Sequence, residues 1–502
     1  QAIAHQGTHL GHRYRLIHLC ASLRSCRMGA SSKLRVAVAA ACSAILSLAN
    51  EDASAFVQVS AQKHESSWPF PVLDDNGGRS VAPTDSVIEH PEPFVRTKLG
   101  WIRGIKQDGA YIFKGIPYAE VPERFSVAEF KKPWEKTMLA SRWGDGCVSS
   151  HLGPRPGATE SEDCLKMTVW VPPGGHKNLP VTVYFHGGQN QQGSAQDPLR
   201  QGDLITKSKE NPIIFVSFDF RLGIFGWIQG YNITSNLGLR DQQMMLHFVK
   251  EHIAAFGGNP HKVTFWGHSE GASNIVAHLV SPQSKGLFHR AILHSPPATV
   301  WSRGSNKIRT EYIIEHSKCA KYYGERMLKC LREAPVDQLM KSEWKGSNLV
   351  RDIGSQKWLN QMDRLYKFER SLELPAQVPS FLGWHAVPDG HIIPHEPRIM
   401  IHEGNWNKVP VVITMTKDES RGVLPLTQME TFTKVALPLF AAGKITQTQD
   451  LYNASLTAAG EKPKDELDLM HHMVTDKVWT CDIIGMAKDM IRTGGKVYLE
   501  VF

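Results

Sequence analysis

The sequence has 502 residues, of which 41% are apolar and 21% charged. These proportions are typical of a soluble globular protein with enough apolar side chains for a large core. The formal charge of +8 is concentrated at the start, because residues 1–55 carry six basic and two acidic side chains and the rest carries only +4. No long basic stripe follows. We therefore expect neither a nucleic acid nor a membrane surface as a partner.

The first methionine, Met28, begins a segment with the pattern of an export signal. Two basic residues precede the apolar run Val36–Leu48, and small residues follow it. This order predicts a secretory signal peptide, and about 13 apolar residues are too few to cross a bilayer. We interpret residues 1–27 as untranslated upstream sequence and 28–55 as the signal peptide. The predicted protein is secreted and extracellular, and no other stretch is apolar enough for a transmembrane helix.

Export makes the cysteines informative, because thiols pair in oxidising compartments. Five of the eight cysteines follow the predicted signal peptide, which leaves an odd number: Cys147, Cys164, Cys319, Cys330 and Cys481. Two N-x-S/T sites, at Asn232 and Asn453, are candidate glycosylation sites compatible with export.

A polar, turn-rich lead-in over 56–92 precedes one large domain, 93–502, in which strand and helix patterns alternate. Strands that are apolar on successive residues are expected to be buried on both faces of a sheet. Strand, helix, strand, helix then predicts an α/β fold with a mainly parallel sheet and helices on both faces. The predicted strands are Val181–Phe185, Ile213–Phe220, Val263–Trp266, Ala291–Leu293, Val409–Ile413 and Lys496–Phe502. The predicted helices are Leu239–Phe256, Gly271–Val280 and Glu311–Glu333.

The segment W-G-H-S-E-G-A-S, Trp266–Ser273, places Ser269 between two glycines, after a predicted strand and before a predicted helix. That context is typical of a nucleophile elbow, in which a strained turn exposes a serine where strand and helix pass closely. The motif alone is equally compatible with an ordinary glycine-rich turn. About 80 residues earlier, another predicted strand opens into H-G-G. Such loops donate backbone N–H groups to the oxyanion of an acyl-transfer reaction.

These motifs together resemble the type-B carboxylesterase and cholinesterase family of α/β-hydrolases, over residues 93–502. The similarity lies in the order and spacing of several segments: G-I-P-Y-A (115–119), S-E-D-C-L (161–165), H-G-G (186–188), F-R-L-G-I-F-G (220–226), N-L-G-L-R-D-Q (236–242), F-G-G-N-P (256–260) and G-H-S-E-G-A (267–272). The resemblance implies the α/β-hydrolase fold. It also implies a serine esterase that needs no metal and no cofactor, with a small-molecule or lipid ester as its substrate.

The resemblance also implies the roles of individual residues. Ser269 is the expected nucleophile, and Glu419, in the place of the family's D-E-G glutamate, is the expected acid, although Ser420 replaces the glycine. The amides expected to hold the oxyanion are those of Gly187, Gly188, Gln189 and Glu270. The base should be a histidine after Glu419, but in the family it lies past the strand in which this chain stops. We therefore expect it to lie beyond Phe502 and the 502-residue chain to be inactive, and we regard His471 or His472 as a poor substitute.

The family's two disulfides are expected between Cys147 and Cys164 and between Cys319 and Cys330. Each should stabilise the fold by roughly 2–4 kcal/mol. Cys481 corresponds to a family cysteine that pairs with one near the C-terminus. An ion pair between Arg124 and Glu162 should brace the first disulfide loop, as a structural feature.

Three residues around the expected site depart from the family pattern. Gln189 replaces a frequent third glycine, and His268 replaces the usual glutamate before the serine. Glu270 replaces the usual alanine after it, and a carboxylate there would oppose a developing oxyanion unless it is paired or points away. His268 is adjacent to Ser269 and points in another direction, so we do not expect it to be the base.

Cholinesterases carry a tryptophan in the loop that corresponds to Cys147–Cys164, where it binds choline through cation–π contact, and this sequence has no tryptophan there. The sequence therefore favours a general carboxylesterase or a lipase-like enzyme over a cholinesterase. The alternative function is a catalytically inactive, cholinesterase-like adhesion or ligand-binding protein. Retention of both Ser269 and Glu419 favours the enzyme.

Overall fold

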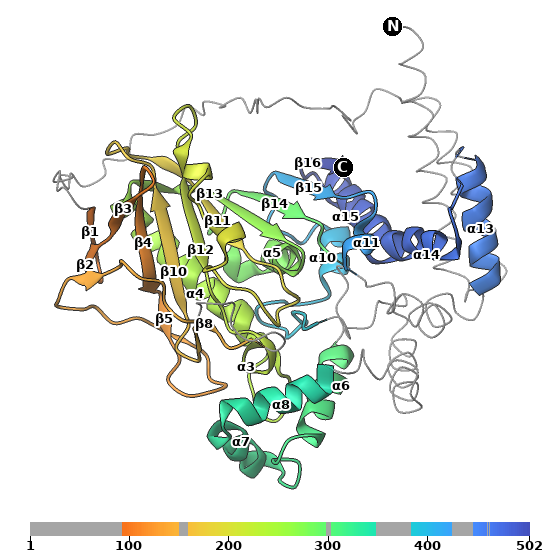
Figure 1. Ribbon diagram of the computed structural model, residues 1–502, viewed down its shortest axis with the longest axis horizontal. Coiled ribbons are helices and arrows are strands. Elements are labelled where there is room, and N and C mark those ends of the chain that lie inside the picture. The colour runs from red at the N-terminus through yellow and green to blue at the C-terminus, as the bar shows by residue number, and fades with distance from the viewer. Residues whose placement is uncertain are drawn as a thin grey trace, which may run out of the picture.

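The computed structural model describes residues 93–149, 159–297, 303–347, 383–423, 445–458, 460 and 462–502. Its centre is a nine-stranded sheet with the order β16-β15-β14-β13-β11-β12-β10-β4-β3, which runs across the molecule in Figure 1. The predicted leader, 1–55, and the whole of the predicted lead-in, 56–92, lie outside the described residues. This sheet confirms the predicted α/β-hydrolase class.

Six strands form the parallel part of the sheet, and each predicted strand coincides with one of them. They are β11 (Leu179–Phe185), β12 (Ile214–Phe218), β13 (Gly258–His268), β14 (Arg290–His294), β15 (Val411–Met415) and β16 (Val497–Val501). All five residues of β12 are buried. Continuous apolar runs therefore predicted the centre of the sheet, because such strands are covered on both faces.

The other three strands are antiparallel and were not predicted. They are β10 (Lys166–Val171), β4 (Ala110–Pro117) and β3 (Ile105–Gln107), which pair in that order beyond β12. Short strands also form three small sheets: β1 (Phe94–Thr97) with β2 (Gly100–Arg103) and β7 (Met138–Leu139), β5 (Ala119–Glu120) with β6 (Glu129–Phe130), and β8 (Gly146–Cys147) with β9 (Glu160–Ser161).

The helices that pack on the sheet include α4 and α5, as predicted, and Figure 1 shows them beside the central strands. The helices are α3 (Gly223–Trp227), α4 (Leu237–His252), α5 (Glu270–Val280), α6 (Arg303–Glu315), α7 (Gly324–Glu333), α8 (Val336–Ser347), α10 (Pro397–Glu403), α11 (Glu419–Val423), α13 (Ile445–Ala458), α14 (Glu466–Thr475) and α15 (Cys481–Arg492). A π-helical turn, Asp476–Thr480, joins α14 to α15. Every side chain of α5 is buried, because this helix lies against β13, β14 and β11.

The predicted helix Glu311–Glu333 is wrong, because the chain turns between α6 and α7. The disulfide Cys319–Cys330 ties this turn to α7, with a Cα–Cα distance of 5.7 Å. The turn lies among polar residues whose helical pattern is continuous with that of both helices. Helices α6, α7 and α8 project together at one end of the molecule (Figure 1).

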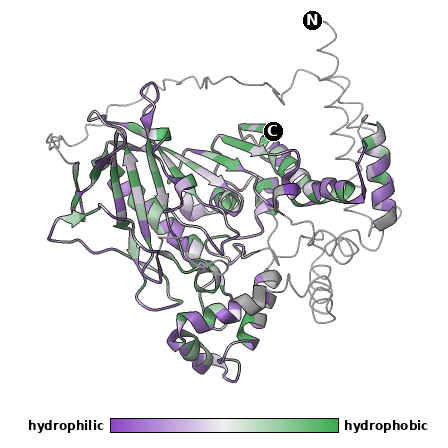
Figure 2. Ribbon diagram, in the orientation of Figure 1, coloured by the Kyte–Doolittle hydropathy of each residue, from purple (hydrophilic) through white to green (hydrophobic). Residues whose placement is uncertain are grey.

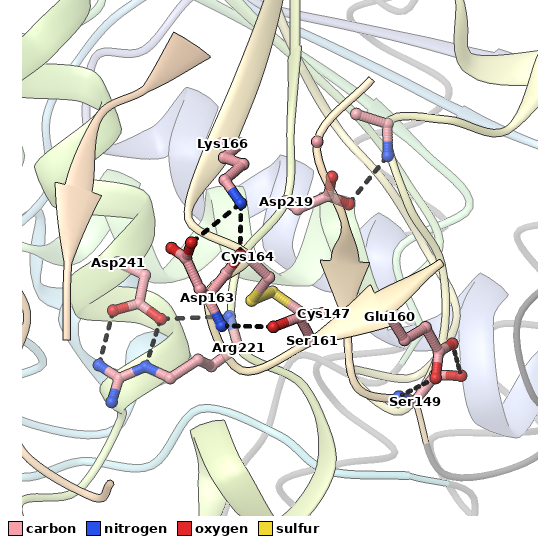
Figure 3. Close-up of a disulfide and its surroundings, with 12 residues drawn as sticks. Cys147, Ser149, Glu160, Ser161, Asp163, Cys164, Lys166, Asp219, Arg221 and Asp241 are labelled. Atoms are coloured by element: carbon pink, nitrogen blue, oxygen red, sulfur yellow. Dashed lines mark hydrogen bonds and ion pairs between the residues drawn. A yellow bond between two sulfur atoms is a disulfide. The ribbon is translucent and has the colours of Figure 1, made fainter. Parts of the chain in front are cut away.

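The second disulfide, Cys147–Cys164, lies beside β8 and β9 (Figure 3). Near it, Arg221 binds Asp241 through two contacts of 2.7 Å, with both side chains almost fully buried. Arg124 and Glu162 form the expected ion pair, at 2.6 Å, and the same guanidinium donates to the carbonyls of Leu331 and Ala334. These contacts fix the loops that lead into the sheet.

Apolar colouring follows the central strands, whereas the projecting helices α6, α7 and α8 carry both polar and apolar colouring (Figure 2). One large buried cluster spans both faces of the sheet and its helices. Within the described ranges, no helix has the length and apolarity needed to cross a bilayer.

Candidate active site

Ser269 follows the last residue of β13 and is the N-cap of α5. Its backbone has φ 54° and ψ −128°, which is a strained conformation for a residue with a β-carbon. The amide of Ser269 donates to the carbonyl of His294 on the neighbouring strand at 2.8 Å. The sheet and the helix therefore hold the strained turn from both sides, as a nucleophile elbow requires.

The two glycines of the motif are needed because β13, α5 and β11 approach one another closely. A β-carbon on Gly271 would lie 2.2 Å from the carbonyl oxygen of Phe185, and one on Gly267 would lie 2.7 Å from the amide of Ala272. Neither contact can be relieved by a side-chain rotation, because each involves the backbone. The spacing of the glycines therefore sets how closely the serine approaches the end of β11.

The H-G-G loop at the end of β11 lies directly against Ser269. A β-carbon on Gly187 would lie 3.0 Å from Cβ of Ser269 and 2.7 Å from the carbonyl oxygen of His268. Within the described part of the chain, the amides of Gly187, Gly188, Gln189 and Glu270 donate no hydrogen bond. Amides left without an acceptor next to a nucleophile are the donors that an oxyanion needs.

The loop is held by its own backbone and by a distant segment. Gln189 and Asn190 have φ 59° and 54°, so both adopt the left-handed conformation in which glycine is favoured. The carbonyl of Gln189 accepts from the amide of Trp384 at 3.0 Å, and the carbonyl of Asn190 accepts from the amide of Gly223 at 2.7 Å. Gln189 therefore keeps the backbone conformation of a glycine and adds a side chain.

Glu270 is 1% exposed and is bound by a histidine that the sequence analysis missed. Nδ1 of His385 lies 2.9 Å from Oε1 of Glu270, and the side-chain amide Nδ2 of Asn190 donates to the same oxygen at 3.3 Å. His385 is 115 residues from Glu270 and lies in no periodic pattern, so no signal in the sequence connects the two. The carboxylate after Ser269 is thus paired, which was one of the two conditions for its compatibility with an oxyanion.

Glu419 is the first residue of α11, four positions after β15 ends. Ser269 and Glu419 thus follow strands that are separated by one strand, β14. Two strand spacings correspond to about 10 Å, a gap that one imidazole with two hydrogen bonds can bridge. Desolvation and the charge of Arg200 lower the pKa of His268, while Glu419 acts in the opposite direction. The carboxylate therefore acts electrostatically on the residue next to the serine.

His471 contacts the residue after Glu419 and not Glu419 itself. Its Nδ1 lies 2.8 Å from Oγ of Ser420, which also donates to the carbonyl of His471 at 2.9 Å. Thr475 completes this cluster by donating to Oγ of Ser420 at 3.1 Å. Burial and the charge of Arg421 lower the pKa of His471. This ring is therefore a buried anchor of α14, and among the described residues no histidine is hydrogen-bonded to Ser269 or to Glu419.

Two other histidines near the site, His294 and His186, are also engaged elsewhere. Nδ1 of His294 is bound to the hydroxyl of Thr414. His186 stacks on Phe220, and burial together with the charge of Arg200 lowers the pKa of His186 to about 3, which keeps the ring neutral. No group of three or more metal-ligating side chains gathers in the described ranges. Asn232 and Asn453 are both exposed.

The carboxylesterase family model matches residues 91–502. Among curated proteins, the chain is 32% identical to an acetylcholinesterase of Danio rerio over 355 residues, which is 66% of this chain and 51% of that protein. It is 31% identical to the para-nitrobenzyl esterase of Bacillus subtilis (strain 168) over 338 residues, which is 65% of this chain and 62% of that enzyme. The chain thus spans about half to three fifths of these relatives.

Two solved structures have the same fold. A PNB esterase superposes with a TM-score of 0.61 at 26% identity, and the carboxylesterase EST55 of Geobacillus stearothermophilus with a TM-score of 0.64 at 25% identity. Each superposition covers 82% of this chain and 79% of the other chain. With the family model matched over the whole region that holds the elbow, the H-G-G loop and Glu419, the chain belongs to the carboxylesterase family.

Proposed function

We propose that this protein is a secreted serine hydrolase that cleaves carboxylic esters through an acyl-enzyme intermediate. Ser269 attacks the ester carbonyl, and the amides of Gly187, Gly188, Gln189 and Glu270 hold the resulting oxyanion. A histidine outside the described residues takes the serine proton and later protonates the leaving alcohol, while Glu419 orients that histidine. Water then hydrolyses the acyl-enzyme by the same relay in reverse. The reaction needs no metal and no cofactor.

The observation that carries the proposal is the juxtaposition of a strained serine with amides that find no acceptor among the described residues. The strain of Ser269 has to be maintained by the surrounding strands, and such strain is found mainly where function uses it. A fold kept only for adhesion has no use for a serine held in this conformation. The proposal therefore ranks above the alternative of an inactive binding protein.

The proposed substrate is a small-molecule or lipid ester without a required cationic group. No tryptophan is present in the loop between Cys147 and Cys164 that could bind a choline-like cation. Gln189 adds a side chain to the loop that would face the acyl group, which favours short acyl chains. We also propose glycosylation of Asn232 and Asn453, whose exposed positions suit an exported protein.

The test is hydrolysis of p-nitrophenyl acetate by the full-length secreted protein. Ser269→Ala should reduce kcat by about 10³-fold or more, because the nucleophile is lost and only binding and oxyanion stabilisation remain. Ser273→Ala, on the same helix, is the matched control: its hydroxyl binds the carbonyl of Pro297 at 3.1 Å, away from the chemistry, and the variant should remain active.

Each outcome of this test has a distinct meaning. A folded wild-type protein without turnover would favour the inactive binding protein. Equal activity of the Ser269→Ala variant and the wild type would reject Ser269 as the nucleophile.

A further inference from the structure

The carboxylate of Glu270 is buried one residue from the proposed nucleophile, and its contacts are few. Oε1 binds Nδ1 of His385 at 2.9 Å and the side-chain amide Nδ2 of Asn190 at 3.3 Å. Oε2 is buried and has no hydrogen-bond partner in the described part of the structure. The shorter contact, to His385, is therefore the main constraint on the direction in which this carboxylate points.

His385 itself is held in place by contacts of its backbone and of its neighbour Trp384. The carbonyl of His385 accepts from the side-chain amide of Asn306 at 2.6 Å. The indole of Trp384 donates to the buried carboxylate of Glu343 at 2.7 Å, and the carbonyl of Trp384 accepts from the side chain of Asn190 at 2.9 Å. The imidazole is thus presented to Glu270 from a fixed backbone, and that backbone is bonded to the H-G-G loop.

The position of Glu270 creates an electrostatic problem for an esterase. Its amide lies at the start of α5, where a developing oxyanion would be bound, and its carboxylate carries the same sign of charge as that oxyanion. Repulsion between like charges is strong in an environment with little water. A carboxylate that is free to turn toward its own amide would therefore raise the barrier to acylation.

We propose that His385 is a positioning residue that holds the Glu270 carboxylate away from the oxyanion hole. The imidazole does this by donating Nδ1–H to Oε1, so that Glu270 is directed toward the segment 383–385. The same bond joins the helix that begins after the nucleophile to the segment that supports the H-G-G loop. This inference rests on the proposed ester hydrolysis at Ser269.

The test is a double-mutant cycle in the full-length protein, with kcat and KM measured for p-nitrophenyl acetate. In the wild-type background, His385→Ala should lower kcat at least about tenfold, because the carboxylate loses its anchor. KM should change much less, because the effect belongs to the transition state. In the Glu270→Ala background, the same His385→Ala substitution should lower kcat by less than about threefold, because no carboxylate remains to be held.

Two further variants separate positioning from general damage to the fold. His385→Gln keeps an N–H donor on the side chain and should restore part of the activity lost in His385→Ala. His395→Ala, at an exposed position ten residues after His385, should behave like the wild type. Thermal unfolding of each variant shows whether it is folded under the conditions of the assay.

An equal loss from His385→Ala with and without Glu270 would overturn the inference, as would full activity of His385→Ala. These outcomes differ from failure of the proposed function. A folded wild type without activity, or an active Ser269→Ala variant, would overturn both, whereas an active wild type with no coupling between positions 270 and 385 would overturn only the role of His385.

Discussion

At the scale of single residues, the absence of one β-carbon at position 271 determines how closely α5 can approach β11. Gly271→Ala should destabilise the protein by about 1–3 kcal/mol or more, because the new methyl would lie 2.2 Å from the carbonyl oxygen of Phe185 and the helix would have to move. The intrinsic preference of alanine for helices is worth only about 1 kcal/mol and would not offset this. Urea unfolding monitored by tryptophan fluorescence measures the change.

Gly485→Ala is the control for Gly271→Ala. It also lies within a helix, α15, but its β-carbon would meet only the end of the Arg398 side chain, at 2.9 Å. Because that guanidinium is bound to Asp482 and Asp489 and can shift more easily than backbone, this variant should lose less stability than Gly271→Ala. Equal effects of the two substitutions would mean that the close approach at Gly271 does not limit the fold.

At single residues, the sequence was informative where a local motif carried the signal. The glycines on either side of Ser269 form one such motif and the H-G-G loop forms another, and the glycines of each occupy positions at which a β-carbon would meet backbone atoms. The pairing of Glu270 with His385 was not predictable, because it joins two segments through tertiary packing alone. For this reason Glu270 stands out in the sequence as a departure from the family pattern, whereas the residue that pairs with it does not.

At the scale of elements, α11 and α14 are joined by the hydroxyl of Ser420, which is fully buried. Ser420→Ala would leave the Nδ1 and carbonyl of His471 and the hydroxyl of Thr475 without their shared partner. The free energy of unfolding should fall by about 1–3 kcal/mol, because buried polar groups without partners are costly.

Thr475→Val is a milder change to the same cluster, because it removes two hydrogen bonds, one to the hydroxyl and one from the amide of Ser420, and keeps the shape of the side chain. Denaturant unfolding should rank the Ser420 variant below the Thr475 variant in stability. The reverse order would show that the hydroxyl of Ser420 is not the centre of the cluster. Since Glu419 precedes Ser420, the Ser420→Ala variant should also slow ester hydrolysis more than the Thr475→Val variant does.

Elements were predicted unevenly, for physical reasons. The six parallel strands contain apolar runs, and all six were found: β12 is buried throughout, whereas β16, at the edge of the sheet, alternates between half-buried and exposed residues. The antiparallel strands β3 and β4 are harder to recognise in the sequence. The exposed Lys106 and the half-buried Lys114 interrupt their apolar runs. The boundary between α6 and α7 was missed because a disulfide, and no proline, marks the turn.

At the scale of the whole molecule, buried ionisable groups should make stability depend on pH. Burial raises the pKa of Asp219 from 3.8 to about 7. Between pH 4 and 7 the unfolded chain has lost this proton and the folded chain retains it, so stability falls as pH rises through this range. The raised pKa corresponds to a loss of about 4 kcal/mol in the free energy of unfolding across this pH range.

Asp219→Asn should remove this dependence and still accept the 2.9 Å hydrogen bond from the amide of Ala195. The variant should match the wild type near pH 4 and exceed its stability by up to about 4 kcal/mol at pH 8. Urea unfolding at several pH values measures the difference, with the exposed Asp450→Asn as a control that should show none. A difference that is constant with pH would contradict the assignment to Asp219.

The contacts of Arg124 bear on the order in which the chain can fold during synthesis. Its guanidinium binds Glu162 but also carbonyls 207 and 210 residues later, at Leu331 and Ala334. When Arg124 leaves the ribosome, the carbonyls of Leu331 and Ala334 that it binds have not yet been synthesised. The segment around Arg124 must therefore remain incompletely packed until α7 has been translated. Ribosome-bound chains that stop before residue 331 should leave this segment open to protease, whereas longer ones should protect it.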